Sequence, residues 1–161
     1  MTREWLPPEQ YIETIARSTS YACLYFTDTR GRPVQLKATY SSDVWQWPGG
    51  NMDPGETPWE CALRECFEET AISFDGPQKL LGAAFGLPRG RWPVNHTGFI
   101  FDGGELTDEQ IEGIVLDPDE HTDLRVHTLA EWEPLMGPQK FERLRKVHEA
   151  RHTGIAVYLE R

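Results

Sequence analysis

The sequence predicts an α/β fold on two observations: strand-like and helix-like segments alternate along the chain, and the turns between them are rich in Gly and Pro. Residues 20–27 (SYACLYFT) and 34–40 are predicted to form strands on either side of a turn over 28–33. With 161 residues the chain has the length of one domain that can bury a core, and we expect a single domain over residues 1–161.

The remaining elements continue the alternation. A short amphipathic helix is predicted over 8–17, and a short strand over 44–47 leads into a Pro-Gly-Gly turn. In the second half of the chain, strands are predicted at 79–87, 94–101, 124–128 and 154–159, and helices at 129–136 and 138–152. An acidic loop is expected over 102–123, with a turn of helix at 107–113.

The best-defined helix begins after Thr57. Thr57 can cap its amino end, Pro58 suits its first turn, and Glu60 has the capping-box spacing from Thr57. Apolar residues at helical spacing form one stripe that we expect to be buried: Trp59, Leu63, Cys66, Phe67 and Thr70. The helix is therefore expected to have one core face and one face that stays open to solvent.

Composition narrows the class of protein. The formal net charge is −10 at pH 7, and a protein that coats nucleic acid normally has a basic surface, so nucleic acid is disfavoured as a partner. The sequence contains no apolar run of about 18 residues and no basic-then-apolar leader, so we expect a soluble, cytoplasmic protein without membrane contact. Its three cysteines are an odd number, and free buried thiols in a reducing compartment are expected.

Three carboxylates gather on the open side of this helix. Offsets of three and four residues bring Glu65, Glu68 and Glu69 together on one side. Crowded carboxylates repel one another and raise each other's pKa unless a cation compensates. Mg²⁺ and Mn²⁺ prefer carboxylate oxygens, and Mg²⁺ typically completes its shell with waters and substrate phosphates. The arrangement indicates a metal site for phosphate chemistry, and the alternative is a solvated acidic helix with an Arg64–Glu68 pair.

The spacing around these carboxylates resembles the Nudix box: Gly, five residues, Glu, seven residues, Arg-Glu, an apolar residue, any residue, Glu-Glu, any residue, Gly and an apolar residue. The segment from Gly50 to Ile72 reads GNMDPGETPWECALRECFEETAI and matches every charged position. Its one clear departure is Ala71, where the pattern has Gly. A glycine just past a helix supplies a left-handed cap, so alanine is expected to cost about 1 kcal/mol of local stability without touching a ligand.

Resemblance to the Nudix family implies an α/β/α sandwich around a mixed sheet, together with a metal site. Glu65, Glu68 and Glu69 would be the main ligands, and the backbone carbonyl of Gly49 would be a further one. The implied cofactor is Mg²⁺, with Mn²⁺ as the alternative. Family members hydrolyse nucleoside diphosphates linked to another moiety: water attacks one phosphorus, and the metals polarise phosphoryl oxygens and stabilise the leaving oxyanion.

Two further box residues would support these ligands. The resemblance implies that Arg64 orients the glutamates and that Glu56 holds the loop or a water. The general base is expected outside the box, on the acidic loop, which offers Glu105, Glu109, Glu112, Asp117, Asp119 and Glu120. We choose Glu120, because related proteins often place such a residue just before a strand like 124–128. The alternatives are a solvated charge run and a role for Glu69 itself in positioning the water.

The substrate is less strongly indicated. Pro88 lies sixteen residues beyond Ile72, where a proline is a feature of ADP-ribose pyrophosphatases in this family. Arg89, Arg91 and Lys37 could grip a pyrophosphate, and Trp45 could stack on a base or sugar; the alternative for the arginines is turn solubility. ADP-ribose or another sugar nucleotide is therefore favoured over a (deoxy)nucleoside triphosphate. Dimers are common in the ADP-ribose branch, so the resemblance leaves a homodimer open.

Two other functions compete with hydrolysis of a nucleotide. His148-Glu149-Ala150-Arg151-His152 matches H-E-x-x-H, in which two histidines bind zinc and the glutamate activates water in metallopeptidases. Only nine residues follow His152, and no spacing identifies a third zinc ligand, so solvated histidines at a helix end are the favoured interpretation. A Nudix-fold binding module without turnover is the other alternative, and such modules usually lose box carboxylates that are all present here.

Overall fold

The computed structural model of the protein describes residues 5–41 and 44–160, so both ends of the predicted domain and residues 42–43 lie outside the described residues. The larger of its sheets has five strands in the order β4-β1-β6-β5-β8. Their bounds are Gly49–Asn51 (β4), Ser18–Asp28 (β1), Asn95–Leu106 (β6), Leu80–Gly86 (β5) and Val157–Glu160 (β8). β1 pairs with β6 and β5 with β8 in parallel, whereas β1–β4 and β5–β6 are antiparallel, so the sheet is mixed as predicted.

A second sheet has three strands in the order β3-β2-β7 and was not expected from the sequence. Its strands are Trp45–Gln46 (β3), Val34–Ala38 (β2) and His121–Val126 (β7). The α-helices are Pro8–Tyr11 (α1), Pro58–Thr70 (α2), Asp108–Glu112 (α3), Leu129–Trp132 (α4) and Pro138–Thr153 (α5). Two short 3₁₀ helices follow α1 and α4, over Ile12–Thr14 and Glu133–Leu135.

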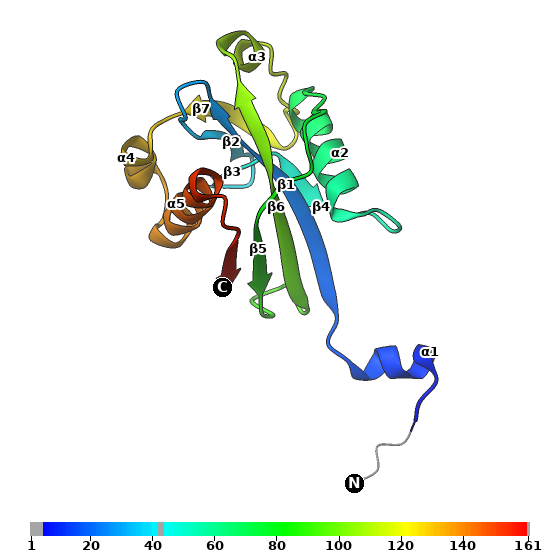
Figure 1. Ribbon diagram of the computed structural model, residues 1–161. Coiled ribbons are helices and arrows are strands. Elements are labelled where there is room, and N and C mark those ends of the chain that lie inside the picture. Colours follow the sequence, from blue (N-terminus) through cyan, green and yellow to red (C-terminus); the bar gives the residue numbers. More distant parts are fainter. Residues whose placement is uncertain (1–4, 42–43, 161) are drawn as a thin grey trace.

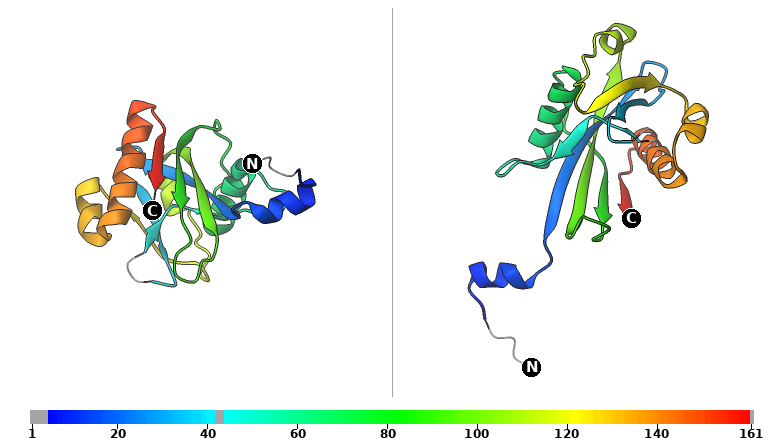
Figure 2. Two further views of the ribbon diagram at one scale, coloured as in Figure 1. Left: turned by 90° about the horizontal axis from the view of Figure 1, so that it is seen from below. Right: turned by 180° about the vertical axis from the view of Figure 1, so that it is seen from behind.

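Helices cover both faces of the larger sheet. Figure 1 shows α2 on one face and α5 on the other, and Figure 2 shows the same layers from below and from behind. Alternate residues of β1 point to opposite faces, so this strand contributes to two separate cores. One core joins Ala22, Leu24 and Phe26 of β1 to Cys61, Ala62 and Cys66 of α2. The other joins Cys23 and Tyr25 to Leu144 and Val147 of α5, and the predicted α/β/α sandwich is confirmed.

Several strand limits differ from the prediction because pairing with β1 and β2 outweighs local composition. β6 extends to Leu106, through residues predicted to be acidic loop, because it pairs with β1 along its whole length. The register shifts after Tyr25, where Gly103 is the extra residue and any Cβ on it would lie 2.5 Å from the Phe26 ring. β7 begins at His121 and not at residue 124, because its antiparallel pairing with β2 starts with His121 opposite Ala38.

Two predictions about helices are wrong. The helix expected over 8–17 ends at Tyr11 and continues only as a 3₁₀ turn, because none of its residues is buried and packing is what stabilises a short helix. Figures 1 and 2 show α1 standing away from the two sheets, at the start of β1. Phe67, expected in the core stripe of α2, is 56% exposed, because it lies one residue and about 100° around the helix from buried Cys66.

Both ends of α2 are as the sequence predicts. Thr57 and Glu60 form the capping box, and Pro58 occupies the first turn. Ala71 adopts the left-handed conformation at φ 59°, and its N–H donates to the Phe67 carbonyl at 2.8 Å. The three cysteines are free and buried, and burial raises the pKa of the Cys61 and Cys66 thiols to about 11.

Replacing Ala71 by Gly is expected to stabilise the protein by about 1 kcal/mol, because a left-handed residue with a Cβ is strained by that amount. Urea unfolding of the wild type and Ala71→Gly at one pH measures this difference. Ala62→Gly, within the helix, is the matched control and should destabilise the protein through lost packing and helix propensity. A less stable Ala71→Gly variant would show that the left-handed cap is unstrained.

The turn after β1 depends on one buried carboxylate. Asp28 is fully buried and accepts hydrogen bonds from the Arg30 and Arg32 amides at 3.0 and 2.7 Å and from the Arg32 guanidinium at 2.8 Å. Burial alone would raise the pKa of Asp28, but these donors hold it below its usual value. Asp28→Asn is expected to lower the free energy of unfolding by about 2 kcal/mol, because bonds to a charged acceptor are lost. Asp108→Asn, on an exposed partner of Arg30, should change stability far less in the same urea titration.

None of the helices in the described part of the chain is long and apolar enough to cross a membrane.

Candidate functional site

Arg64 of α2 holds three glutamates and the chain before the helix. Its Nε and Nη2 donate to the two oxygens of Glu56 at 2.8 and 3.0 Å. Its Nη1 donates to Glu65 and to Glu68, each at 2.9 Å, and Nη2 also reaches the Asn51 carbonyl at 3.2 Å. A planar guanidinium with five donors is suited to this arrangement. Arg64 therefore sets the positions of the two box carboxylates that flank it on the helix surface.

Glu56 anchors this arginine from the loop before α2. Its carboxylate also accepts a hydrogen bond from the Asp53 amide at 2.9 Å. The hydrogen bonds from Arg64 and Asp53 lower the pKa of Glu56 to about 2, so it stays ionised over any working pH. Burial acts in the opposite direction on Glu65 and raises its pKa, although Arg64 counteracts part of the effect. Glu65 is thus a partly desolvated carboxylate that gains from a nearby cation.

The glycines of β4 permit close approach of the helix. A Cβ on Gly50 would lie 2.4 Å from the carboxylate of Glu65, so a side chain at this position would displace that glutamate. The amide of Gly49 donates to Glu69 Oε2 at 2.9 Å and fixes the third box glutamate from the strand side. The two glycines therefore bring α2 against β4 and leave room for its carboxylates.

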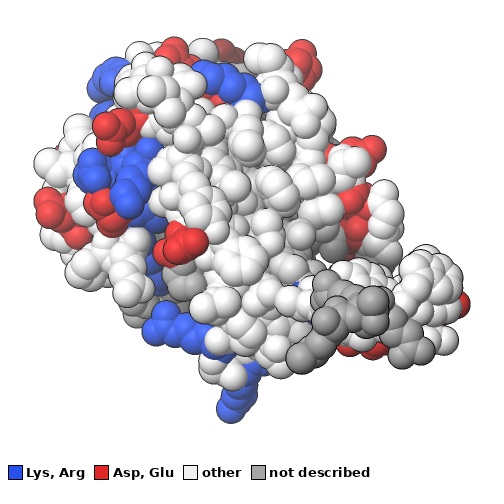
Figure 3. Space-filling model, turned by 60° about the horizontal axis from the view of Figure 1, so that its bottom comes forward, with Lys and Arg blue, Asp and Glu red and all other residues white. Residues whose placement is uncertain are grey.

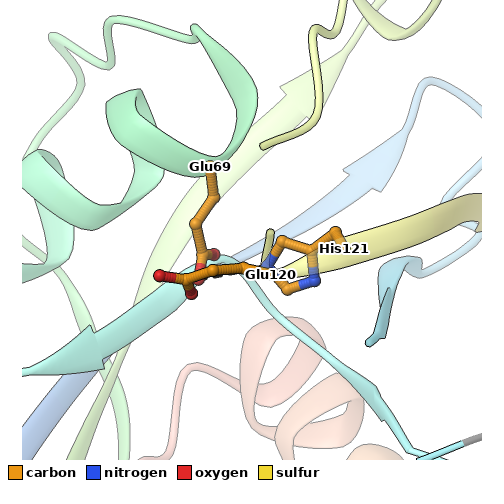
Figure 4. Close-up of side chains that lie close together, drawn as sticks. All are labelled: Glu69, Glu120 and His121. Carbon is orange, nitrogen blue, oxygen red and sulfur yellow. Dashed lines mark ion pairs between the residues drawn. The ribbon is translucent and has the colours of Figure 1, made fainter. Parts of the chain in front are cut away.

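Glu69 differs from Glu65 and Glu68 in its surroundings, because it is buried between α2 and the start of β7. It is 2% exposed, and its Oε1 lies 3.1 Å from His121 Nε2. Figure 4 shows Glu69 reaching down from α2 toward Glu120 and His121, which lie at the start of β7. Burial raises the pKa of Glu69 to about 7, although His121 and the Gly49 amide counteract it. In His121, burial lowers the pKa but the interaction with Glu69 outweighs it, so the pKa is raised.

This donor set fits a divalent cation. One ligand atom from each of Glu69, Glu120 and His121 lies within 4.8 Å of the others. Glu69 Oε1 and both ring nitrogens of His121 are buried without a hydrogen-bond partner in the described part of the chain. Buried polar atoms without partners are rare in folded proteins, and an ion that binds both residues would satisfy Glu69 Oε1 and one of the two ring nitrogens.

The structure brings seven of the predicted site residues to one place. They come from β4, the loop before α2, α2 itself and the residue before β7: Gly49, Glu56, Arg64, Glu65, Glu68, Glu69 and Glu120. Glu68 and Glu120 are exposed, whereas Glu69 is buried, so the glutamates do not share a single exposed face as the helical spacing suggested. Their catalytic and metal-binding roles stay predictions.

Two of the predicted substrate contacts, Lys37 and Trp45, pair with each other across β2 and β3. Trp45 is 6% exposed and packs on Trp132 in the core, while Lys37 and Arg125 lie over its ring at 5.8 and 5.1 Å. The stacking role assigned to Trp45 is therefore corrected: its ring is enclosed by side chains and offers no open face to a base or sugar. The Lys37 side chain is directed at this ring, which accounts for its position without a phosphate.

Arg89 and Arg91 lie in the hairpin between β5 and β6, at the far end of the sheet from the glutamates. His96, beside this hairpin, pairs with Thr19, whereas Gly49 pairs with Cys23, which is about 13 Å further along β1. A shallow pocket here is lined by Gly86, Leu87, Arg89, Trp92 and His96. Figure 3 turns the lower end of the molecule forward and shows mainly uncharged side chains in the middle, with Lys and Arg toward the edges.

The H-E-x-x-H segment does not form a zinc peptidase site. His148 Nε2 and His152 Nε2 are 3.1 Å apart on α5, and Tyr25 Oη contacts His148 Nδ1 at 2.6 Å. Glu149 is exposed and pairs with Arg145. Among the described residues, no third ligand joins the two histidines in a cluster of metal-binding groups. His152 is exposed at the helix end as expected, whereas His148 is half-buried against Tyr25.

His121 is the site residue that sequence reasoning missed. It belongs to none of the motifs, and its segment reads as an acidic loop, so no periodicity marks it as buried. Only its position beside Glu120 could have pointed to it. Its burial depends on the pairing of β7 with β2, which brings residues 34–38 and 121–126 together from distant parts of the chain.

Comparison with known proteins agrees with this fold. The family model described as NUDIX domain matches residues 16–147. An RNA pyrophosphohydrolase from Azorhizobium caulinodans is 40% identical over 46% of this chain and 51% of its own length. Nudix hydrolase 3 from Caenorhabditis elegans is 37% identical over 46% of this chain and 30% of its own length. The chain thus spans about half the length, or less, of these curated relatives.

Solved structures share the fold at low sequence identity. The MutT protein from Methanosarcina mazei Go1 superposes with a TM-score of 0.64 at 18% identity, covering 86% of this chain and 96% of its own. A UDP-X diphosphatase superposes with a TM-score of 0.64 at 20% identity, covering 96% of this chain and 75% of its own. With the family model matching most of its length and the box residues gathered at one site, the chain belongs to the Nudix family.

Proposed function

We propose that the protein is a Mg²⁺-dependent hydrolase that cleaves the pyrophosphate bond of nucleoside diphosphates linked to another moiety. Nudix enzymes generally use divalent metals, and Mn²⁺ is the alternative ion. The observation that supports this proposal most is buried Glu69, fixed by the Gly49 amide, with an unpaired oxygen directed at Glu120 and His121. A carboxylate with a raised pKa in a polar cluster is typical of a functional site.

The residues that would hold the ion are Glu65, Glu68, Glu69 and the carbonyl of Gly49. When bound, the ion would polarise phosphoryl oxygens and neutralise charge on the leaving phosphate. Arg64 and Glu56 would keep the glutamates in place between turnovers, because their mutual hydrogen bonds do not involve substrate. The many acidic groups of the chain repel a polyphosphate, so a bound cation would also allow the substrate to approach the site.

Glu120 is the proposed general base. It is exposed at the end of the acidic segment and lies next to Glu69, so a water between the two carboxylates and the substrate phosphorus is within reach. In the proposed step the water oxygen attacks phosphorus, its proton passes to the Glu120 carboxylate, and the bond from phosphorus to the bridging oxygen breaks. The departing phosphate retains the electron pair of that bond as an oxyanion, and the proton on Glu120 then returns to solvent.

The favoured substrates are ADP-ribose and other sugar nucleotides, ahead of (deoxy)nucleoside triphosphates. The Pro88 position supports the first group, and the name of the UDP-X diphosphatase, which shares this fold, is compatible with it. A second candidate arises because several relatives at 36% identity or more are named RNA pyrophosphohydrolase. A 5′-triphosphorylated RNA therefore belongs among the substrates to be tested, although the net charge of −10 works against long polyanions.

A product assay across a panel tests the proposed function. The panel contains ADP-ribose, other sugar nucleotides, dinucleotides, nucleoside triphosphates including 8-oxo-dGTP, and a 5′-triphosphorylated RNA oligonucleotide, each with Mg²⁺ and with Mn²⁺. Release of a nucleoside monophosphate from one class would support the proposal and identify the substrate group. Silence across the panel, combined with nucleotide binding in calorimetry, would favour a binding module instead.

The compartment and assembly are proposed on separate grounds. Three free buried cysteines support a reducing, cytoplasmic location, where thiols persist. A homodimer is proposed from the family resemblance alone. Light scattering during size-exclusion chromatography measures the mass in solution, and the mass of a monomer would contradict that proposal.

A further inference from the structure

His121 is an unusual component of a site otherwise built from carboxylates. Its side chain is 2% exposed and forms an ion pair with Glu69, while neither ring nitrogen completes an aligned hydrogen bond in the described part of the chain. Buried histidines normally donate one ring N–H and accept at the other nitrogen. The backbone fixes the residue firmly, because its amide donates to the Asp117 carbonyl at 2.8 Å and its strand pairs with β2. The ring therefore belongs to a rigid part of the fold.

The ring is directed into the glutamate cluster. Its Nε2 lies 3.1 Å from Glu69 Oε1, but the contact lacks the alignment of a hydrogen bond, because both atoms remain without a hydrogen-bond partner. In Figure 4 the imidazole edge faces the Glu69 carboxylate, and the Glu120 carboxylate lies on the same side. The three residues converge from two elements, α2 and the start of β7.

The spacing of the two atoms is that of neighbouring ligands on one ion. A nitrogen and an oxygen bound at about 2.1–2.2 Å and at a right angle are about 3.0–3.1 Å apart, and at a tetrahedral angle they are about 3.4 Å apart. The observed 3.1 Å therefore suits an octahedral ion that binds both.

We propose that His121 Nε2 is a direct ligand of a divalent ion that Glu69 also binds. The ligand set thus includes a nitrogen beside the carboxylate oxygens. Imidazole suits transition metals, whereas Mg²⁺ prefers an all-oxygen shell, so this position is expected to bind Mn²⁺ and Co²⁺ in preference to Mg²⁺. The inference rests on the proposed function for the identity of the glutamates as ligands, but it concerns which atom completes the shell.

Pulsed EPR of bound Mn²⁺ tests the inference without substrate or turnover. Wild-type protein is loaded with less than one equivalent of Mn²⁺, and nitrogen hyperfine coupling is recorded. The expected result is a ¹⁴N coupling that is replaced by a ¹⁵N coupling when the protein is prepared with ¹⁵N-labelled histidine. Bound Mn²⁺ with no histidine nitrogen coupling would overturn the inference, and so would the absence of Mn²⁺ binding.

Two variants assign the nitrogen to its residue. His121→Gln should lose the coupling and weaken Mn²⁺ binding by about 10- to 100-fold, with a smaller effect on Mg²⁺, as measured by calorimetry. His148→Gln, which alters an imidazole on α5, should keep both the coupling and the Mn²⁺ affinity. An unchanged coupling in folded His121→Gln would overturn the assignment; if that variant does not fold, the isotope experiment on the wild type and His148→Gln decides.

The outcomes also separate this inference from the proposed function. Histidine coupling in a protein that is silent across the nucleotide panel would support the inference and count against hydrolysis. Turnover of a nucleotide by a protein whose Mn²⁺ shows no histidine coupling would support hydrolysis and overturn the inference about His121.

Discussion

Replacing Glu69 by Gln is expected to lower kcat by about 100- to 1,000-fold, the effect of removing one group placed to stabilise charge in the transition state. The protein should remain folded, because the amide oxygen of Gln can still accept the Gly49 N–H that now bonds Glu69 Oε2 at 2.9 Å. Burial raises the pKa of Glu69 to about 7, so a neutral side chain is better tolerated here than the metal-free carboxylate. Activity and stability are therefore expected to change in opposite directions.

Steady-state kinetics with the best substrate of the panel, together with urea unfolding in a chelator, measure both effects. Glu149→Gln is the matched control: it makes the same substitution on exposed α5, where the side chain pairs only with Arg145, and it should leave kcat unchanged. Near wild-type activity in Glu69→Gln would remove the main support for the proposed metal site. Loss of activity in Glu149→Gln would reopen the interpretation of H-E-x-x-H as catalytic.

The sequence predicts the local structure around the box better than the pairing between distant segments. The box, the cap at Thr57 and the strained Ala71 are local patterns, and the structure reproduces each because neighbouring residues alone determine them. The strand at β1 is also a local prediction, whereas the sandwich follows from the resemblance to the Nudix family and the structure adds that β1 contributes to both cores. The local features require no knowledge of which distant segments meet.

The errors about strand limits and about His121 and Trp45 share one physical cause, which is pairing between distant segments. The three-stranded sheet depends on β7 joining β2, and that pairing turns part of an apparent acidic loop into a strand and buries His121. Trp45 appears suited to stacking when considered alone, but its strand places it against Trp132 in the core. Residues such as Arg89 and Arg91 are near the box in sequence, whereas a hairpin carries them to the opposite end of the sheet.

Replacing Arg64 by Ala is expected to affect both stability and turnover, because one guanidinium joins Glu56, Glu65 and Glu68. Hydrogen bonds to charged groups contribute about 1.5–3 kcal/mol each, and the pairs here are partly exposed, so we expect a loss of about 3 kcal/mol in the free energy of unfolding. Turnover at limiting Mg²⁺ should fall by about 10- to 100-fold, since residues that orient metal ligands have effects of that size.

The difference in stability between the wild type and Arg64→Ala is expected to become smaller at acid pH. Arg64 lowers the pKa of Glu56 from 4.5 to about 2, so the stabilisation is fully present above pH 4.5 and is lost as the pH falls toward 2. Without Arg64 the pKa of Glu56 should return toward 4.5, and the stability difference between wild type and Arg64→Ala should narrow over that interval. Arg64→Lys keeps the charge but not the planar guanidinium. Its free energy of unfolding should lie between those of the wild type and Arg64→Ala, and high Mg²⁺ should partly restore its activity. Acid titrations followed by tryptophan fluorescence measure the trend, and a gap that stays constant from pH 5 to pH 2 would contradict the role assigned to the Arg64–Glu56 pair.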